Sequence, residues 1–125
     1  MAVKPGLTAA VELTVAAADT AAALRSGDVP MLGTPRVVAL VEEASIAAIA
    51  GHLDPEFTSV GMRVQLDHLI PVPVGVTVRA EATLERVEGR RLTFTVSVNN
   101  ERGLVAAGRV TRVLVNRQRF LDKAL

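Results

Sequence analysis

The chain has 125 residues, half of them hydrophobic, and a formal net charge of +1 at pH 7. This length and composition predict one domain, residues 1–125, with its own hydrophobic core. Basic residues are spread along the chain and only 2% of residues are aromatic, so we expect no nucleic-acid partner. The absence of cysteine excludes disulfides and a cysteine nucleophile, and it favours a cytoplasmic location.

Residues 7–15 alternate loosely between apolar and polar positions and predict a first strand. The alanine-rich residues 16–24 predict a short helix or turn. A run of Ser, Gly, Asp, Val and Pro at 26–30 then interrupts the pattern. Residues 1–24 lack a basic start followed by an uninterrupted apolar run, so we expect no signal peptide.

Residues 32–52 predict one long helix. Thr34 followed by Pro35 is typical of a helix start, because a threonine side chain can cap a free N–H and proline suits the first helical position. Gly51 is placed to end the helix. Apolar residues occur on all its sides, so we expect it to be buried in protein. It is short for a membrane span and carries two glutamates, so we expect no membrane partner.

After the helix and a polar connection, the apolar pattern changes to a period of two, which is typical of strands. The predicted strands cover residues 62–70, 76–87, 92–99 and 104–115. Short turns between them favour an antiparallel meander. Together with the first strand, the pattern predicts an α+β class, in which one long central helix is wrapped by a curved antiparallel sheet of about five strands.

Three polar residues of the predicted helix are candidates for chemistry. Thr34 is most simply a helix cap, although a helix start also gathers N–H groups that can hold an oxyanion. Glu42 and Glu43 point about 100° apart, so at most one of them faces the deepest part of the core. Each is either a tolerated polar fringe or a carboxylate whose raised proton affinity suits a general base or nucleophile.

His68 lies on the apolar face of its predicted strand, with Val64, Leu66 and Ile70. It is either a hydrogen-bonded core histidine or a group aimed at the helix, where a carboxylate and a hydroxyl can converge. Arg112 lies on the apolar face of the last strand and needs an anionic partner, which makes it a structural ion pair or a substrate contact. Two histidines without clustered carboxylates supply too few metal ligands, so we expect no metal site.

Four sequence features between residues 32 and 115 occur together in one enzyme family. They are Thr34 with Glu42 eight positions later, Gly61 with His68 seven positions later, Val-Glu-Gly-Arg-Arg at 87–91, and the stretch from Gly108 to Arg112. With these features the chain resembles the hot-dog-fold acyl-CoA thioesterases. Within them it is most similar to the branch that includes the fluoroacetyl-CoA thioesterase.

The resemblance implies a hot-dog fold, an acyl-CoA substrate, no cofactor, and a homodimer or higher homo-oligomer. It also implies that Thr34, Glu42 and His68 are catalytic and that Gly61 and Arg112 lie at the acyl pocket. Glu42 would act as nucleophile or as the base that activates water, and the sequence leaves both roles open.

One feature departs from that branch, which has an aromatic lid just before the helix. Residues 25–31 contain no aromatic residue here, and the matching position is Asp28. Thioester hydrolysis is still expected, but fluoroacetyl selectivity has no basis in this segment.

Two other functions are compatible with the same fold. A non-catalytic hot-dog protein would hold an acyl-CoA or another small ligand without hydrolysing it. An enoyl-CoA hydratase would carry an Asp-to-His motif, which we do not find.

Helix geometry adds a prediction about where one site comes from. Thr34 and Glu42 are eight residues apart, so their backbones are separated by roughly 12 Å at 1.5 Å per residue. One thioester carbonyl does not reach both within one chain. Two antiparallel helices packed across a twofold axis would bring Thr34 of one subunit to Glu42 of the other.

Overall fold

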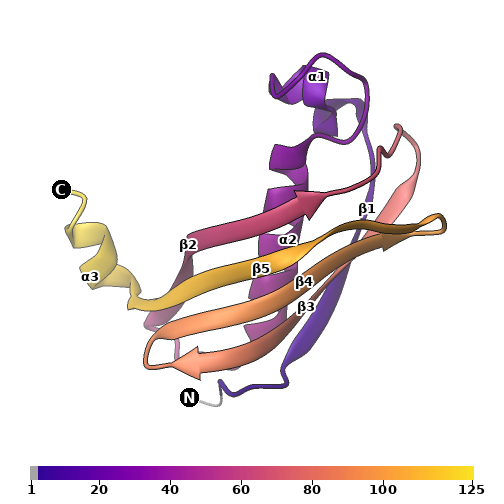
Figure 1. Ribbon diagram of the computed structural model, residues 1–125. Coiled ribbons are helices and arrows are strands. Elements are labelled where there is room, and N and C mark those ends of the chain that lie inside the picture. The colour runs from indigo at the N-terminus through magenta and orange to yellow at the C-terminus, as the bar shows by residue number, and fades with distance from the viewer. Residues whose placement is uncertain (1–2) are drawn as a thin grey trace.

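A curved antiparallel sheet lies against one long helix in the computed structural model, which describes residues 3–125 (Figure 1). Across the sheet the strands follow the order β1-β3-β4-β5-β2. The strands are β1 (Thr8–Thr14), β2 (Phe57–His68), β3 (Thr77–Glu88), β4 (Arg91–Asn100) and β5 (Gly103–Asn116). The helices are the 3-10 turn η1 (Ala17–Asp19), α1 (Ala21–Leu24), α2 (Thr34–Ile49) and α3 (Arg117–Asp122). The α+β architecture predicted from the sequence is confirmed.

The hydrophobic core lies between α2 and the concave face of the sheet. Alternate residues of β3 and β4 point inward and are buried, as their period of two predicts. From α2, one side of the helix packs onto them through Val37, Leu40, Val41, Ala44, Ala48 and Ile49. Full burial of a side chain such as Leu40 or Phe94 contributes about 1.5–3 kcal/mol to stability.

The position of β2 differs from the predicted meander. Only β3, β4 and β5 are joined as consecutive neighbours, whereas β2 pairs with β5 at the edge of the sheet. Strand β2 also begins at Phe57, five residues before the predicted start, and ends at His68. A bulge between Gly61 and Arg63 shifts the period-two pattern, and residues 57–60 before it are all half-buried, so they show no inward and outward alternation.

The start of α2 differs from the predicted cap. Gly33 is the N-cap, and Thr34 is already the first helical residue, so its side chain makes no capping bond. The hydroxyl is free for another partner. At the other end, Gly51 has a φ of +80° directly after the C-cap Ala50, so the predicted glycine stop is confirmed.

The sequence pattern predicts that helix α2 is buried on all sides, but in the protomer one side is exposed. Pro35, Ala39, Ile46 and Ala50 are exposed, and Ile46 keeps 47% of its surface accessible. These residues are four, seven and four positions apart, and they form a stripe on the side away from the sheet. The reason is that one sheet covers only one side of a helix. The protomer therefore presents an uncovered, mostly apolar helix surface.

Helix α3 has no counterpart in the predicted elements. The Asn116 side chain caps it by accepting a hydrogen bond from the Arg119 N–H at 3.1 Å. It is a six-residue helix without a buried residue, so it has no apolar periodicity to detect. Within residues 3–125, no helix is long and apolar enough to cross a membrane.

Candidate active site

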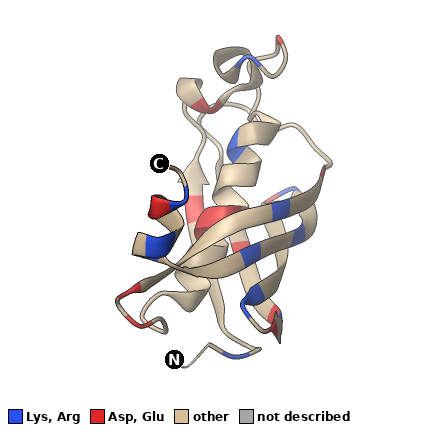
Figure 2. Ribbon diagram, turned by 90° about the vertical axis from the view of Figure 1, so that its left-hand side faces the viewer, with Lys and Arg blue, Asp and Glu red and all other residues tan. Residues whose placement is uncertain are grey.

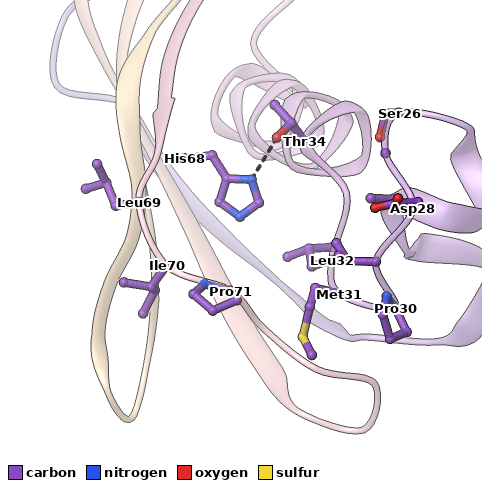
Figure 3. Close-up of a pocket in the computed structure, with 13 residues that line it drawn as sticks. Ser26, Asp28, Pro30, Met31, Leu32, Thr34, His68, Leu69, Ile70 and Pro71 are labelled. Atoms are coloured by element: carbon purple, nitrogen blue, oxygen red, sulfur yellow. Dashed lines mark hydrogen bonds between the residues drawn. The ribbon is translucent and has the colours of Figure 1, made fainter.

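Thr34 and His68 meet where β2 ends beside the start of α2. The Thr34 Oγ1 and the His68 Nδ1 lie 2.9 Å apart, at hydrogen-bond distance (Figure 3). The sequence put Thr34 at a helix start and His68 on the inward face of a strand, and the fold brings these two places together. Since Gly33 holds the capping position, the hydroxyl of Thr34 serves the imidazole instead.

The ring of His68 lies in a poorly hydrated place. Its Nε2 is buried and has no hydrogen-bond partner among residues 3–125. Burial lowers the pKa of His68 below its ordinary value, and the Ile70 backbone opposes this shift in part. The imidazole is therefore neutral at pH 7, and a neutral ring can accept a proton.

A cavity of about 600 Å³ opens beside this pair. Residues 26–32, from the loop after α1, form one wall, and the segment 68–71 forms the other (Figure 3). Asp28 is the only Asp, Glu, Lys or Arg among its lining residues, and most of the others are apolar. This volume and lining are typical of a site for a small ligand.

Glu42 lies in a second group, further along α2. Its Oε2 accepts a hydrogen bond from the Arg112 Nη1 at 2.6 Å, in an ion pair in which the Arg112 side chain is 7% exposed and that of Glu42 29%. Arg112 also donates from Nε to the Ser59 Oγ and from Nη2 to the Ser59 carbonyl oxygen, both at 2.9 Å. Burial is the larger effect on Arg112 and lowers its pKa, while the charge of Glu42 acts in the opposite direction.

Gly61 leaves room for this carboxylate. It pairs with Arg112 across the β2–β5 ladder. A Cβ at Gly61 would lie 2.5 Å from the Glu42 Oε2 and 3.5 Å from the Arg112 Nη1. Any side chain here would push the Glu42 carboxylate away from its present position.

Glu43 belongs to a different set of contacts. Its carboxylate accepts from the Arg36 Nη1 at 2.9 Å, and the Arg36 Nε donates to Asp19 at 3.1 Å. Both carboxylates raise the pKa of Arg36, with Glu43 the larger cause. The two neighbouring glutamates thus face different partners.

The structure brings the five predicted site residues together as two groups. Thr34 and His68 form one, and Glu42, Gly61 and Arg112 form the other. Both groups lie along α2, one near its first residue and one about two turns later. Among residues 3–125 there is no cluster of three or more His, Asp or Glu side chains that could hold a metal ion.

Sequence reasoning missed Ser59, which holds two of the three hydrogen bonds of Arg112. The signal was the arginine itself, since a buried guanidinium needs several acceptors. Its partner could not be named, because the pairing of β5 with β2 was not predicted.

Comparison with known proteins identifies the family. A sequence model of the family described as fluoroacetyl-CoA-specific thioesterase matches residues 15–118. The chain belongs to this family. Membership in the fluoroacetyl-CoA-specific thioesterase family confirms the resemblance drawn from residues 32–115, and it makes the chain a thioesterase.

Individual members agree with this assignment. The fluoroacetyl-CoA thioesterase of Streptantibioticus cattleyicolor is 32% identical over 93 residues, which are 74% of this chain and 67% of that protein. A crystallised variant of the fluoroacetyl-CoA thioesterase in complex with acetyl-CoA is 26% identical and superposes with a TM-score of 0.92, over 98% of this chain and 96% of that chain.

Two further solved structures extend the likeness beyond that enzyme. A thioesterase superfamily member from Thermus thermophilus has 28% identity and a TM-score of 0.87, over 95% of this chain and 88% of that chain. A hot-dog-like protein from Thermanaerovibrio acidaminovorans has 25% identity and a TM-score of 0.88, over 96% and 89% of the two chains. The predicted hot-dog fold is thereby confirmed.

Proposed function

We propose that this thioesterase hydrolyses a small acyl-CoA to the free acid and CoA, with Thr34, Glu42 and His68 as its catalytic residues. The observation that carries the proposal is the contact between the Thr34 hydroxyl and the His68 imidazole at the mouth of an apolar cavity of about 600 Å³. Such a cavity has room for a short acyl group. The relative crystallised with acetyl-CoA supports this substrate class.

The proposed active unit is a homodimer with composite sites. In the protomer, Glu42 is held by Arg112 rather than by Thr34 or His68. The exposed stripe on α2 suits an antiparallel contact with the same helix of a second copy, which would bring Glu42 of one subunit to the Thr34 and His68 of the other. A closed twofold contact of this kind creates two equal sites.

The free edge of β2 supports the same arrangement. This twelve-residue strand pairs with β5 on one side only. A long unpaired edge is a template for another strand. Pairing of two β2 edges would continue the sheet across the twofold axis and set the two α2 helices side by side. We propose that this contact, together with the α2 stripe, forms the dimer.

In the proposed reaction, Glu42 supplies the nucleophile in one of two ways. As a general base, it removes a proton from water, whose oxygen adds to the thioester carbonyl carbon. As a nucleophile, it adds directly and forms a mixed anhydride, which water then hydrolyses. In both routes the C–S bond breaks and the CoA thiolate takes up a proton.

The other residues act around this step. The Thr34 hydroxyl and the Thr34 backbone N–H stabilise the oxyanion that forms on the carbonyl oxygen. No other N–H of the first turn is available, because Pro35 has none and the Gly33 and Arg36 N–H groups donate to the Asp19 and Gly33 carbonyl oxygens. His68, neutral at pH 7, orients the Thr34 hydroxyl and polarises the reacting groups. Arg112 positions the Glu42 carboxylate, and Gly61 keeps the space beside it open for the acyl group. The proposed mechanism needs no metal or cofactor.

A panel of short acyl-CoA substrates with a thiol reagent tests the proposed function. We expect purified protein to release free CoA from at least one straight, branched or aromatic acyl-CoA, and the Glu42→Gln variant to release far less. Saturable binding without hydrolysis across the whole panel would show an acyl-binding protein instead.

The same panel addresses selectivity. The cavity wall formed by residues 26–32 carries Asp28 and no aromatic residue, so we propose that this segment gives no preference for fluoroacetyl-CoA over acetyl-CoA. We also expect a cytoplasmic location, a prediction that rests on the cysteine-free sequence.

A further inference from the structure

Helix α3 presents two apolar side chains that the protomer covers only in part. Phe120 is 41% exposed and Leu121 is 54% exposed, although both belong to a helix of only six residues. Figures 1 and 2 show α3 standing off the sheet beyond the first residues of β2, on the side where α2 lies. A short helix held away from its own core in this way is suited to contact something else.

The mouth of the 600 Å³ cavity is also apolar and uncovered. Val29 and Leu69 line the cavity with exposed fractions of 49% and 55%, and Val74, just beyond its wall, is 49% exposed. Asp28 adds one negative charge to this rim. No hydrogen bond or ion pair of Asp28 is present among residues 3–125.

The charges on α3 complement this rim. Arg117 and Arg119 lie in the helix and Lys123 follows it, against a single acidic residue, Asp122. All four are exposed. Helix α3 therefore complements the cavity rim in two ways: its apolar side chains suit the apolar rim, and its positive charges suit the carboxylate of Asp28.

The start of α3 is fixed beside the first residue of β2. Asn116, the last residue of β5, pairs with Phe57. The Arg117 N–H donates to the Glu56 carbonyl oxygen at 2.9 Å. The helix therefore cannot reach the cavity of its own chain, which lies at the opposite end of β2.

In the composite dimer proposed above, the two β2 strands run antiparallel. The end of β2 that carries α3 therefore lies near the end of the partner's β2 that carries the cavity. This dimer places Gly61, which touches the Glu42 carboxylate, beside the partner subunit's His68. Antiparallel strands advance in opposite directions, one residue at a time. In that register residues 57–60 extend past the partner subunit's His68, where β2 ends, toward the segment that follows it. The root of α3 then lies beside the segment that continues from the partner's cavity wall.

We propose that α3 of each subunit covers the mouth of its partner's acyl cavity, with Phe120 as the aromatic cover. The inference rests on the proposed composite dimer. Phe120 and Leu121 pack on the apolar rim, and the basic residues of α3 face Asp28. The cover excludes water from the thioester and limits the length of acyl group that fits. The site is incomplete without the second copy.

Crosslinking tests the contact without reference to activity, since the chain has no cysteine of its own. One preparation carries Phe120→Cys and another carries Val74→Cys. The two are mixed, allowed to exchange subunits and treated with a short bismaleimide. We expect a covalent dimer in the mixture and little in either preparation alone. A matched control pairs Phe120→Cys with Thr83→Cys, whose residue lies on the outer face of β3.

Two outcomes would overturn the inference. One is a mixture that yields no more crosslinked dimer than the Thr83→Cys control, although light scattering shows a dimer. The other is a protein that is monomeric in solution. Hydrolysis of the acyl-CoA panel by the unmodified protein is measured separately, so a failure of the proposed function is seen independently of a failure of the cover.

Subunit mixing then shows which chain supplies the cover. In a heterodimer of Thr34→Ala and Glu42→Gln chains, the intact site uses the cavity of the Glu42→Gln chain. Adding Phe120→Ser to the Thr34→Ala chain should lower the recovered kcat/KM by about 10-fold, the order of effect expected for lost apolar contacts around a small substrate. Adding it to the Glu42→Gln chain should change little. The opposite pattern would place α3 over its own cavity and overturn the proposal.

Discussion

Glu42 and Glu43 are neighbours in the sequence but have different partners in the fold. Glu42 faces the buried Arg112, whereas Glu43 faces Arg36 and is about half exposed. We expect Glu42→Gln to lower kcat by about 100-fold or more, as loss of a general base does. Glu43→Gln should leave kcat close to that of the wild type and change stability by at most about 1 kcal/mol, because its ion pair is exposed. Release of CoA and urea unfolding of both variants measure the difference, and equal activity would remove Glu42 from the mechanism.

The pKa of His68 predicts the acid side of the pH–rate profile. Burial lowers this pKa below the ordinary value of 6.5, so the ring stays neutral as the pH falls to 6.5 and is protonated only at lower pH. We therefore expect kcat/KM to decline on a limb whose midpoint is below 6.5. A midpoint above this value would contradict the buried state of the ring. His68→Asn, which cannot titrate, serves as the control.

The same shift makes a contribution to stability with a defined sign. Because the pKa of His68 is lower in the folded than in the unfolded state, the unfolded chain binds more protons at acid pH. This group's contribution to the free energy of unfolding is thus complete above 6.5 and declines as the pH falls below it.

Strand pairing between β2 and β5 depends on a glycine. A Cβ added at Gly108 would overlap the backbone carbonyl oxygen of Gln65 on the neighbouring strand. We expect Gly108→Ala to lower the free energy of unfolding by about 1–3 kcal/mol, because neither strand can move away without losing ladder hydrogen bonds. Gly27→Ala is the matched control, since a Cβ there meets only the Ala21 Cβ at 3.4 Å. Equal unfolding midpoints for the two variants would show that the strands separate easily.

The pattern of apolar residues predicted the strands but not their order. Phe94, Val96 and Val98 alternate with polar residues, so their inward direction follows from the sequence. The crossing of β2 to the far side of β5 does not, because the same alternation fits next to either strand. The first part of β2 is not identified for a related reason: residues 57–60 are all half-buried, and the bulge after Gly61 puts them out of phase with the rest of the strand.

The composite site is a property of the whole dimer, so its test uses subunits from two different variants. Thr34→Ala and Glu42→Gln proteins, each folded and strongly impaired, are mixed and allowed to exchange subunits. Each heterodimer then has one intact site and one doubly altered site, so random mixing should restore about a quarter of the wild-type activity by twofold counting. Recovery no greater than that of the separate variants, after exchange is verified, would mean that Thr34 and Glu42 act within one chain.

The sequence by itself determined the fold class, the family and five candidate residues. It could do so because helix and strand periods are local, and because Thr34, Glu42, Gly61, His68 and Arg112 stand at spacings that the resemblance uses. That these residues form the catalytic site stays a prediction.

Only the tertiary structure decided which of these side chains contact one another. In the fold, the Thr34 hydroxyl contacts His68 and does not cap the helix. Glu42 contacts Arg112, whose side chain is also bound by Ser59 across the paired strands β2 and β5. The tertiary structure also left one side of α2 uncovered and every residue of α3 exposed. These contacts join residues 34 to 70 positions apart, and no local preference of the chain specifies which distant strands become neighbours.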